Sequence, residues 1–132
     1  MFTVCIGATK DLKNLVIGNG KDCIIAEVEI DECLCGYPVG LAMYKLLKEK
    51  VFKRDWFIYS YEVKEDGKVI HSESMQDGTM KDVRTVNDVD NSLDGFAIGE
   101  CVVAASHYRV KVIEDKMTEE KKADKPKIAF DD

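Results

Sequence analysis

Apolar and polar residues alternate along several short stretches of the chain, and this period of two predicts β-strands. The first stretch, Phe2–Ala8, is rich in β-branched residues and predicts a strand. In Asp22–Ile30 the last residues alternate acidic and apolar, so we expect one wet face and one buried face. The run Leu15–Ile17 precedes it, and Gly18-Asn19-Gly20-Lys21 between the two predicts a hairpin turn because Asn and Gly tolerate positive φ.

The apolar period changes to that of a helix over Pro38–Lys50. Proline suits the first helical position, and lysines gather at the C-terminal end, where cations suit the helix dipole. We expect Met43, Leu46 and Leu47 to pack against a sheet and Lys45 to lie on the far side.

A second hairpin is predicted over Asp55–Ser74, with Glu65-Asp66-Gly67-Lys68 as its turn. Strict alternation places Phe57, Tyr59 and Tyr61 on one face of its first strand and Trp56 on the other. The polar segment Gln76–Asp94 fits a weak helix or, over residues 82–88, an edge strand. The β-branched stretch Gly95–Glu114 predicts one bent strand or two.

This order of elements predicts an α+β domain over residues 1–114, in which a mainly antiparallel, curled sheet packs on one principal α-helix. A hotdog- or cystatin-like fold fits the order, and an OB-type barrel is the alternative. Residues 115–132 are charged, contain Pro126 and lack apolar periodicity, so we expect a flexible tail. Within that tail, Ile128–Phe130 is a short apolar hook suited to docking on another chain.

Composition limits the classes of partner and the compartment. The chain has 19 basic and 25 acidic residues, a net charge of −6, which disfavours broad nucleic-acid or membrane binding. Its start lacks the basic and apolar regions of a signal peptide, and its longest nearly uncharged stretch, Gly95–His107, contains Glu100. Five cysteines, an odd number, then favour reduced thiols and a cytoplasmic location.

Motifs for metals, cofactors and catalysis are incomplete. Cys33 and Cys35 are separated by one residue, whereas structural zinc sites use wider spacing and a second pair. The segment Asp90–Gly95 begins like a calcium loop, but Cys101 stands where a bidentate Glu is needed. We therefore expect no metal and no cofactor.

Catalytic residues are equally sparse. His71 and His107 are the two histidines, and neither lies in a recognised catalytic motif. We therefore expect no enzymatic activity. In the hotdog alternative, a carboxylate before the helix, Asp31 or Glu32, would be the base.

Binding residues are sought among aromatic and basic side chains, because these two kinds together stack on and neutralise nucleic acids and also anchor protein partners. The candidates are Phe57, Tyr59, Tyr61, Lys53, Arg54, His107, Arg109 and Phe130. Residues 45–54 hold five bases and one acid, whereas residues 76–100 hold six acids and two bases. Opposed patches of this kind favour self-association or a charged partner.

Our leading hypothesis is a small, cytoplasmic, acidic and non-catalytic protein that binds another protein and forms a homo-oligomer. Compact acidic domains without motifs are typical of accessory, inhibitor and assembly proteins, including those of phages and other viruses or mobile elements. The first alternative is an OB-type protein that binds single-stranded nucleic acid through the aromatic strand, against which the net charge speaks. The second is a hotdog-like enzyme or a small-ligand binder.

Overall fold

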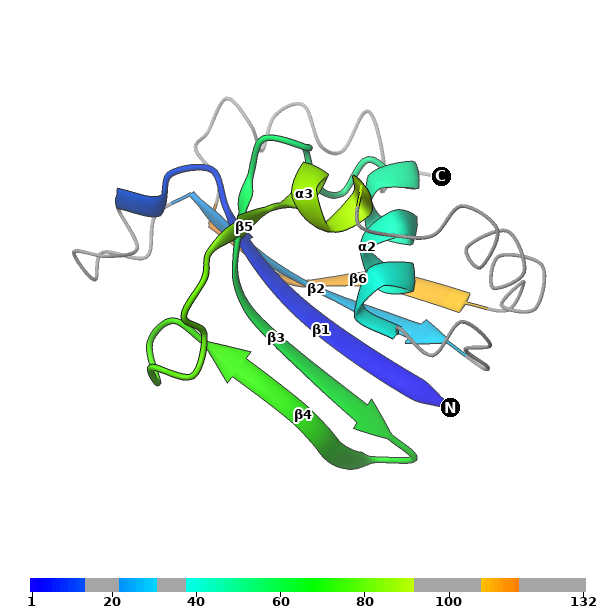
Figure 1. Cartoon of the computed structure of the whole chain (residues 1–132). Helices are drawn as coiled ribbons and strands as arrows, with labels where there is room; N and C mark the ends of the chain where they lie inside the picture. Colours follow the sequence, from blue (N-terminus) through cyan, green and yellow to red (C-terminus); the bar gives the residue numbers. More distant parts are fainter. Residues whose placement is uncertain (14–21, 31–37, 92–107, 117–132) are drawn as a thin grey trace.

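The computed structural model describes residues 1–13, 22–30, 38–91 and 108–116, and its six strands form one antiparallel sheet (Figure 1). The strands are β1 (Phe2–Thr9), β2 (Cys23–Ile30), β3 (Phe57–Glu65), β4 (Lys68–Ser74), β5 (Arg84–Thr85) and β6 (Tyr108–Asp115). Their order is β4-β3-β1-β2-β6, and β5 pairs with the start of β3. Two small helices, α2 (Pro38–Lys48) and α3 (Val86–Asn91), complete the described part.

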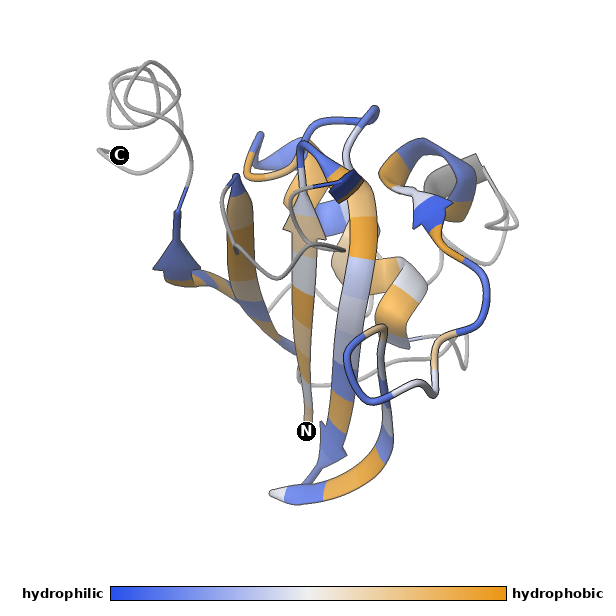
Figure 2. Ribbon diagram, turned by 90° about the vertical axis from the view of Figure 1, so that its left-hand side faces the viewer, coloured by the Kyte–Doolittle hydropathy of each residue, from blue (hydrophilic) through white to orange (hydrophobic). Residues whose placement is uncertain are grey.

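The core lies between α2 and one face of the sheet. Every second residue of β1 and β2 points into it, from Val4 to Ala8 and from Ile24 to Ile30, and these side chains are fully buried. Apolar and polar residues accordingly alternate along the strands in Figure 2. The opposite face of the sheet, here called the open face, carries Cys5, Glu27, Glu29, Arg109 and Lys111 among others.

Several predictions from periodicity are confirmed. The strand over Phe2–Ala8, the two-faced strand before Ile30 and the helix that begins at Pro38 are all present. The second hairpin forms with a two-residue turn, in which Asp66 and Gly67 both have positive φ, as a type I′ turn requires.

The helix face was predicted correctly except at Lys45. Met43 and Leu46 are fully buried, and Leu47 is half-buried at the edge of the core. Lys45, placed on the far side by the helical period, has only 2% of its surface exposed. Its ammonium group lies over the ring of Tyr108. Tyr108 is distant in the sequence, so the period of the helix could not indicate this contact.

The predicted first hairpin is wrong in its pairing. β2 pairs with β1 on one edge, from Cys23 to Ile30, and with β6 on the other, so its neighbours are not the Leu15–Ile17 run. Those residues and the turn at 18–21 lie outside the described residues.

The segments that the sequence left ambiguous resolve in part. Within 76–94, residues Arg84–Thr85 form a short strand and Val86–Asn91 a short helix, so both interpretations were partly right. Of the predicted strand at Gly95–Glu114, the end forms β6, and residues 95–107 lie outside the described part.

The sheet and helices make this an α+β fold dominated by an antiparallel sheet, as expected, although two small helices stand where one principal helix was predicted. β6 extends to Asp115, and Lys116 still donates its N–H to the Cys23 carbonyl oxygen, so the described body runs two residues beyond position 114. No helix in the described ranges is long and apolar enough to cross a lipid bilayer.

Candidate functional site

A cleft of about 680 Å³ lies on the helix side of the sheet, above β3 and β4. Helix α2 packs mainly against β2 and β1, and in Figure 1 the β3–β4 hairpin extends beyond it. The walls come from β3, β4, the segment 79–84, α3 and the first residues of α2. The lining residues are Pro38, Val39, Ile58, Tyr61, Val63, Ile70, His71, Glu73, Thr79, Met80, Lys81, Asp82, Arg84 and Val89.

A β-bulge in β3 decides which of its side chains face the cleft. Gly7 pairs with Ser60 and Ala8 with Ile58, so Tyr59 is an extra residue between them. Because of this insertion, Ile58 and Tyr61 both face the cleft, which strict alternation would not allow. The ring of Tyr59 instead covers Gly7 on the open face, where a Cβ on Gly7 would lie 2.7 Å from Tyr59 Cζ.

A second β-bulge, in β4, aims His71 into the cleft. Lys64 pairs with Val69 and Val63 with His71, so Ile70 is the extra residue. Directly opposite residues share a face, which puts His71 beside Val63 and Glu73 beside Tyr61. The bulge in β4 therefore brings His71 and Glu73 to the side of the sheet on which Tyr61 lies.

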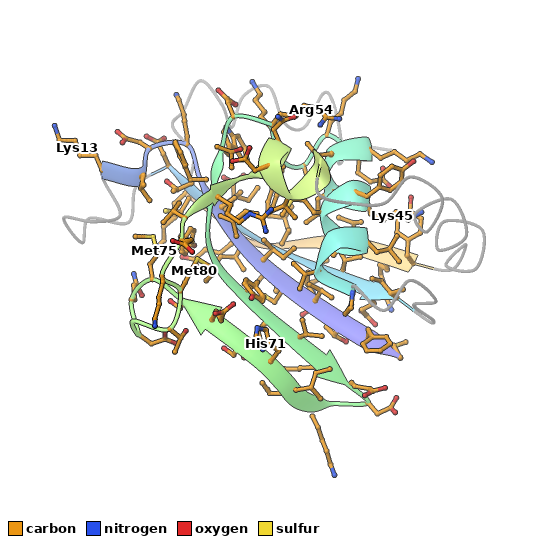
Figure 3. The ribbon with its side chains drawn as sticks, in the orientation of Figure 1. Lys13, Lys45, Arg54, His71, Met75 and Met80 are labelled. Carbon is orange, nitrogen blue, oxygen red and sulfur yellow. The ribbon has the colours of Figure 1, made fainter. Side chains whose placement is uncertain are left out.

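These three side chains form a hydrogen-bonded cluster, here called the Tyr–His–Glu cluster. The Tyr61 hydroxyl donates to Glu73, and His71 Nε2 lies 3.0 Å from the same hydroxyl and 3.3 Å from Glu73 Oε2. Since the Tyr61 hydroxyl donates to Glu73, His71 Nε2 donates to the tyrosine oxygen, and in the neutral tautomer with the proton on Nε2 the Nδ1 atom is an acceptor. Figure 3 labels His71 on β4. About half of its side chain, 54%, is exposed.

The opposite wall carries charged groups. Lys81, Asp82 and Arg84 line the cleft and are exposed, while Met80 beside them packs against the core. Among the described residues, Arg84 Nη2 donates to the Asp88 carbonyl oxygen at 3.4 Å. The cleft thus has an apolar floor between the hydrogen-bonded Tyr–His–Glu cluster and a wall of charged side chains.

The aromatic face predicted for β3 is wrong, because the bulge splits it. Tyr59 is buried on the open face with Cys23, and Phe57 lies opposite Thr9 and shares that face. Tyr61 lies on the cleft side. Trp56 is buried in the main core against Phe52, opposite to Phe57 as expected.

The other predicted binding residues are not brought together. Arg54 donates to the Asn87 side chain at 3.2 Å, and Lys53 is exposed beside it. Arg109 lies across the sheet, with its Nε 3.6 Å from Glu29 Oε1. His107 and Phe130 lie outside the described residues.

Sequence reasoning missed Glu73 and gave His71 no role. The available signal is that the two residues are two apart in a strand and so share a face. The bulge in β4 decides which face of the sheet His71 and Glu73 occupy, and so whether Tyr61 can join them. No motif in the sequence indicates this bulge.

Lys45 is a second buried group, between α2 and β6. Its Nζ lies 3.9 Å from the centre of the Tyr108 ring, whose hydroxyl donates to Glu49 at 3.1 Å. Loss of hydration lowers the pKa of Lys45, and Lys48 adds to this effect. The same burial, with the bond to Glu49, raises the pKa of Tyr108.

The two described cysteines are free thiols. Burial raises the pKa of Cys5, and the carboxylates of Glu27 and Glu62 raise it further, which makes a slow nucleophile. Across the described ranges, no three His, Cys, Asp or Glu side chains form a metal-binding group. Cys33, Cys35 and the part of the calcium-like segment after Asn91 lie outside those ranges.

No protein-family model matches the chain, and no curated protein or solved structure matches it either.

Proposed function

We propose that the protein binds a small organic ligand in the cleft above β3 and β4. The observation that carries this proposal is the cleft itself, whose volume of about 680 Å³ lies within the usual range of small-molecule sites. Apolar side chains form its floor and a few polar groups converge on it, which is the common composition of such sites.

Recognition would use the free atom of the Tyr–His–Glu cluster. Tyr61 and Glu73 fix the His71 ring by hydrogen bonds to Nε2, so Nδ1 can accept a hydrogen bond from a ligand. A ring held on one side by two partners loses little freedom on binding, and this favours affinity and orientation.

We propose binding rather than catalysis. In the cluster the acidic, basic and hydroxyl groups satisfy one another, since Tyr61 donates to Glu73 and accepts from His71. The one atom of the cluster that is left for a general base is His71 Nδ1, and our proposal assigns this atom to hydrogen bonding with the ligand. The proposal thereby keeps the sequence-based hypothesis of a non-catalytic protein.

The test is a fragment screen by ligand-observed NMR, followed by mapping on the amide spectrum of the ¹⁵N-labelled protein. Hits should shift the amides of the strands that line the cleft, with the largest changes near Tyr61, Val63 and His71. Ile113 on β6, an exposed apolar residue of the opposite edge, serves as the internal control. Shifts centred on β6 or on the open face, or a screen without hits, would contradict the proposal.

A protein partner and a homo-oligomer form a second proposal, and the open face supports it. On this face the acids of β2, Glu27 and Glu29, lie directly opposite Lys111 and Arg109 of β6. Sheet edges are poorer candidates, because both β4 and β6 contain a bulge and charged residues, which oppose regular strand addition. Sedimentation at low and high salt tests it, and a monomer under both conditions would contradict self-association.

We further propose that the sheet has the hotdog- or cystatin-like form expected from the order of its elements. A hotdog- or cystatin-like sheet curled around its helix would leave a concave face for a ligand, as the cleft requires. The alternative hypothesis, binding of single-stranded nucleic acid through the aromatic residues of β3, loses its main support. Tyr59 is buried on the open face, and Tyr61 lies on the opposite face, in the cleft. Titration with a labelled oligonucleotide tests that rival directly, since binding to phosphates falls steeply with salt.

A further inference from the structure

We propose that the cleft selects organic anions, molecules with an apolar or aromatic body and one acidic group such as a carboxylate, sulfonate or phosphate. This inference rests on the proposed ligand-binding function and adds the chemical class of the ligand. It follows from three properties of the cleft: its floor, its cations and the state of its carboxylates.

The floor suits an apolar body. Ile58 and Val63 from β3 and Val89 from α3 are less than 5% exposed, and they form the bottom of the cleft with Val39. Met80 closes one side, and its unbranched thioether adapts to different shapes (Figure 3). A ring or short acyl chain placed there loses contact with water at little cost to the protein.

The cations are available to a ligand. Lys81 and Arg84 both line the cleft, and within the described part of the chain no carboxylate oxygen lies within 4.0 Å of either side chain. The bond from Arg84 to the Asp88 carbonyl oxygen uses one of its donors and leaves the others. A guanidinium and an ammonium on one wall match an anionic group by charge and by hydrogen bonding.

The two carboxylates of the cleft, Glu73 and Asp82, lie in different places. Glu73 already accepts the Tyr61 proton and lies beside His71, so its charge is partly satisfied within the cluster. Asp82 is the one carboxylate beside Lys81 and Arg84, so this wall has a surplus of one positive charge, although the two carboxylates and two cations of the whole cleft balance. The chain as a whole has a net charge of −6, so this surplus is local and opposite in sign to the rest of the molecule.

The experiment compares two fluorescent probes with nearly the same aromatic body. Anilinonaphthalene sulfonate carries one sulfonate, and phenylnaphthylamine carries none. Both are titrated into the full chain and into the double variant Lys81→Gln/Arg84→Gln. The matched control is Lys10→Gln/Arg109→Gln, which removes the same charge at exposed positions outside the cleft.

A third variant, Met80→Trp, narrows the cleft and tests whether the probes bind there at all. Circular dichroism and thermal unfolding confirm that each variant is folded before its affinity is compared. Met80 is partly buried in a segment of the cleft wall, so a second narrowing variant, Thr79→Trp at an exposed position, covers the case in which Met80→Trp does not fold.

We expect Lys81→Gln/Arg84→Gln to lower the affinity for the sulfonate probe by about fivefold or more, since each charge-assisted hydrogen bond contributes a sizeable part of that affinity. The affinity for the neutral probe should not change. The control variant Lys10→Gln/Arg109→Gln should change the affinity for neither probe. The tryptophan variants that narrow the cleft should lower the affinity for both probes. If both probes bind and Lys81→Gln/Arg84→Gln changes their affinities equally, the preference for anions is contradicted, whereas the proposal of a ligand site is retained. If narrowing has no effect, or neither probe binds, the cleft is not a ligand site and both proposals fail.

Discussion

Val63 on β3 lies directly opposite His71 on β4, although counting back from the hairpin turn would place Ile70 there. The extra residue in β4 moves the histidine, and with it Glu73, onto the side of the sheet that carries the cleft. The position of the Tyr–His–Glu cluster is thus set by the register of one hairpin.

Two single-residue deletions test this register. Deleting Ile70 makes the pairing regular and keeps His71 opposite Val63, so contacts between the Tyr61 and His71 rings should persist. Deleting Ser72 instead moves Glu73 opposite Glu62 and out of the cleft. Nuclear Overhauser effects among the three side chains measure the outcome, and loss of the cluster in both variants would show that the bulge has another role.

Leu46 and Leu47 are adjacent leucines that differ in burial and so form a matched pair. Leu46 is fully buried against the sheet, whereas Leu47 is half-buried at the edge of the core. Leu46→Ala should lower the free energy of unfolding by about 2–5 kcal/mol, the usual range for a buried leucine. Leu47→Ala should cost clearly less, and urea unfolding measures both. Equal costs would mean that the helix face is assigned wrongly.

Gly7 is required by the ring that covers it. A Cβ at this position would lie 2.6 Å from Ser60 Oγ and 2.7 Å from Tyr59 Cζ, both on a buried part of the open face. Gly7→Ala should therefore destabilise the protein by roughly 1–3 kcal/mol, as overpacking does. The control is Gly67→Asn, where nothing lies within 4 Å and asparagine tolerates the positive φ. If thermal unfolding shows Gly7→Ala to be the milder of the two, the bulge geometry is wrong.

Lys45 makes stability depend on pH in a defined direction. Loss of hydration lowers its pKa in the folded protein, and in the unfolded chain the pKa returns to about 10.4. Between the two values the unfolded chain binds more protons, so the free energy of unfolding contributed by Lys45 rises with pH. Below both values the penalty of burying the ammonium is fully present.

Lys45→Met removes this penalty together with the contact to the Tyr108 ring. The stability of the variant relative to the parent should therefore be highest near neutral pH and should decrease as the pH approaches about 10. Urea unfolding at several pH values measures this difference. A difference that stays constant, or grows, with rising pH would contradict a lowered pKa.

The end of the folded body is tested by two truncations. Lys116 donates its N–H to the Cys23 carbonyl oxygen at 2.7 Å and accepts from the Asp22 N–H at 2.9 Å. Removing residues 117–132 should change the free energy of unfolding by less than about 0.5 kcal/mol, because the sequence predicts a flexible tail there. Removing residues 115–132 also deletes both hydrogen bonds and should cost about 1–3 kcal/mol more. Equal effects of the two truncations would place the boundary elsewhere.

Elements with a regular period were predictable from the sequence. β1, β2 and α2 repeat apolar residues every two or every three to four positions, and an Asp-Gly pair marks the turn between β3 and β4. In each case the signal is local, because it depends on neighbours within a few residues.

The candidate site depended on information that is not local. Counting alternate residues through Tyr59 and through Ile70 gives the wrong face beyond each bulge, since one inserted residue inverts the pattern. Likewise Lys45 is polar at a helical position, and its burial is explained by Tyr108, which comes from the last described strand. The faces of the residues beyond the two bulges and the burial of Lys45 were thus determined by contacts with distant segments and not by residue type.

The order of the strands also has a consequence for synthesis on the ribosome. β2 lies inside the sheet, yet one of its two neighbours, β6, follows it by roughly 80 residues, so their pairing has a high contact order. Until β6 emerges, the apolar run of Cys23–Ala26 presents an unpaired edge to solvent or to other nascent chains. The chain therefore completes its sheet late, and we expect it to benefit from chaperones and from slow expression at low temperature.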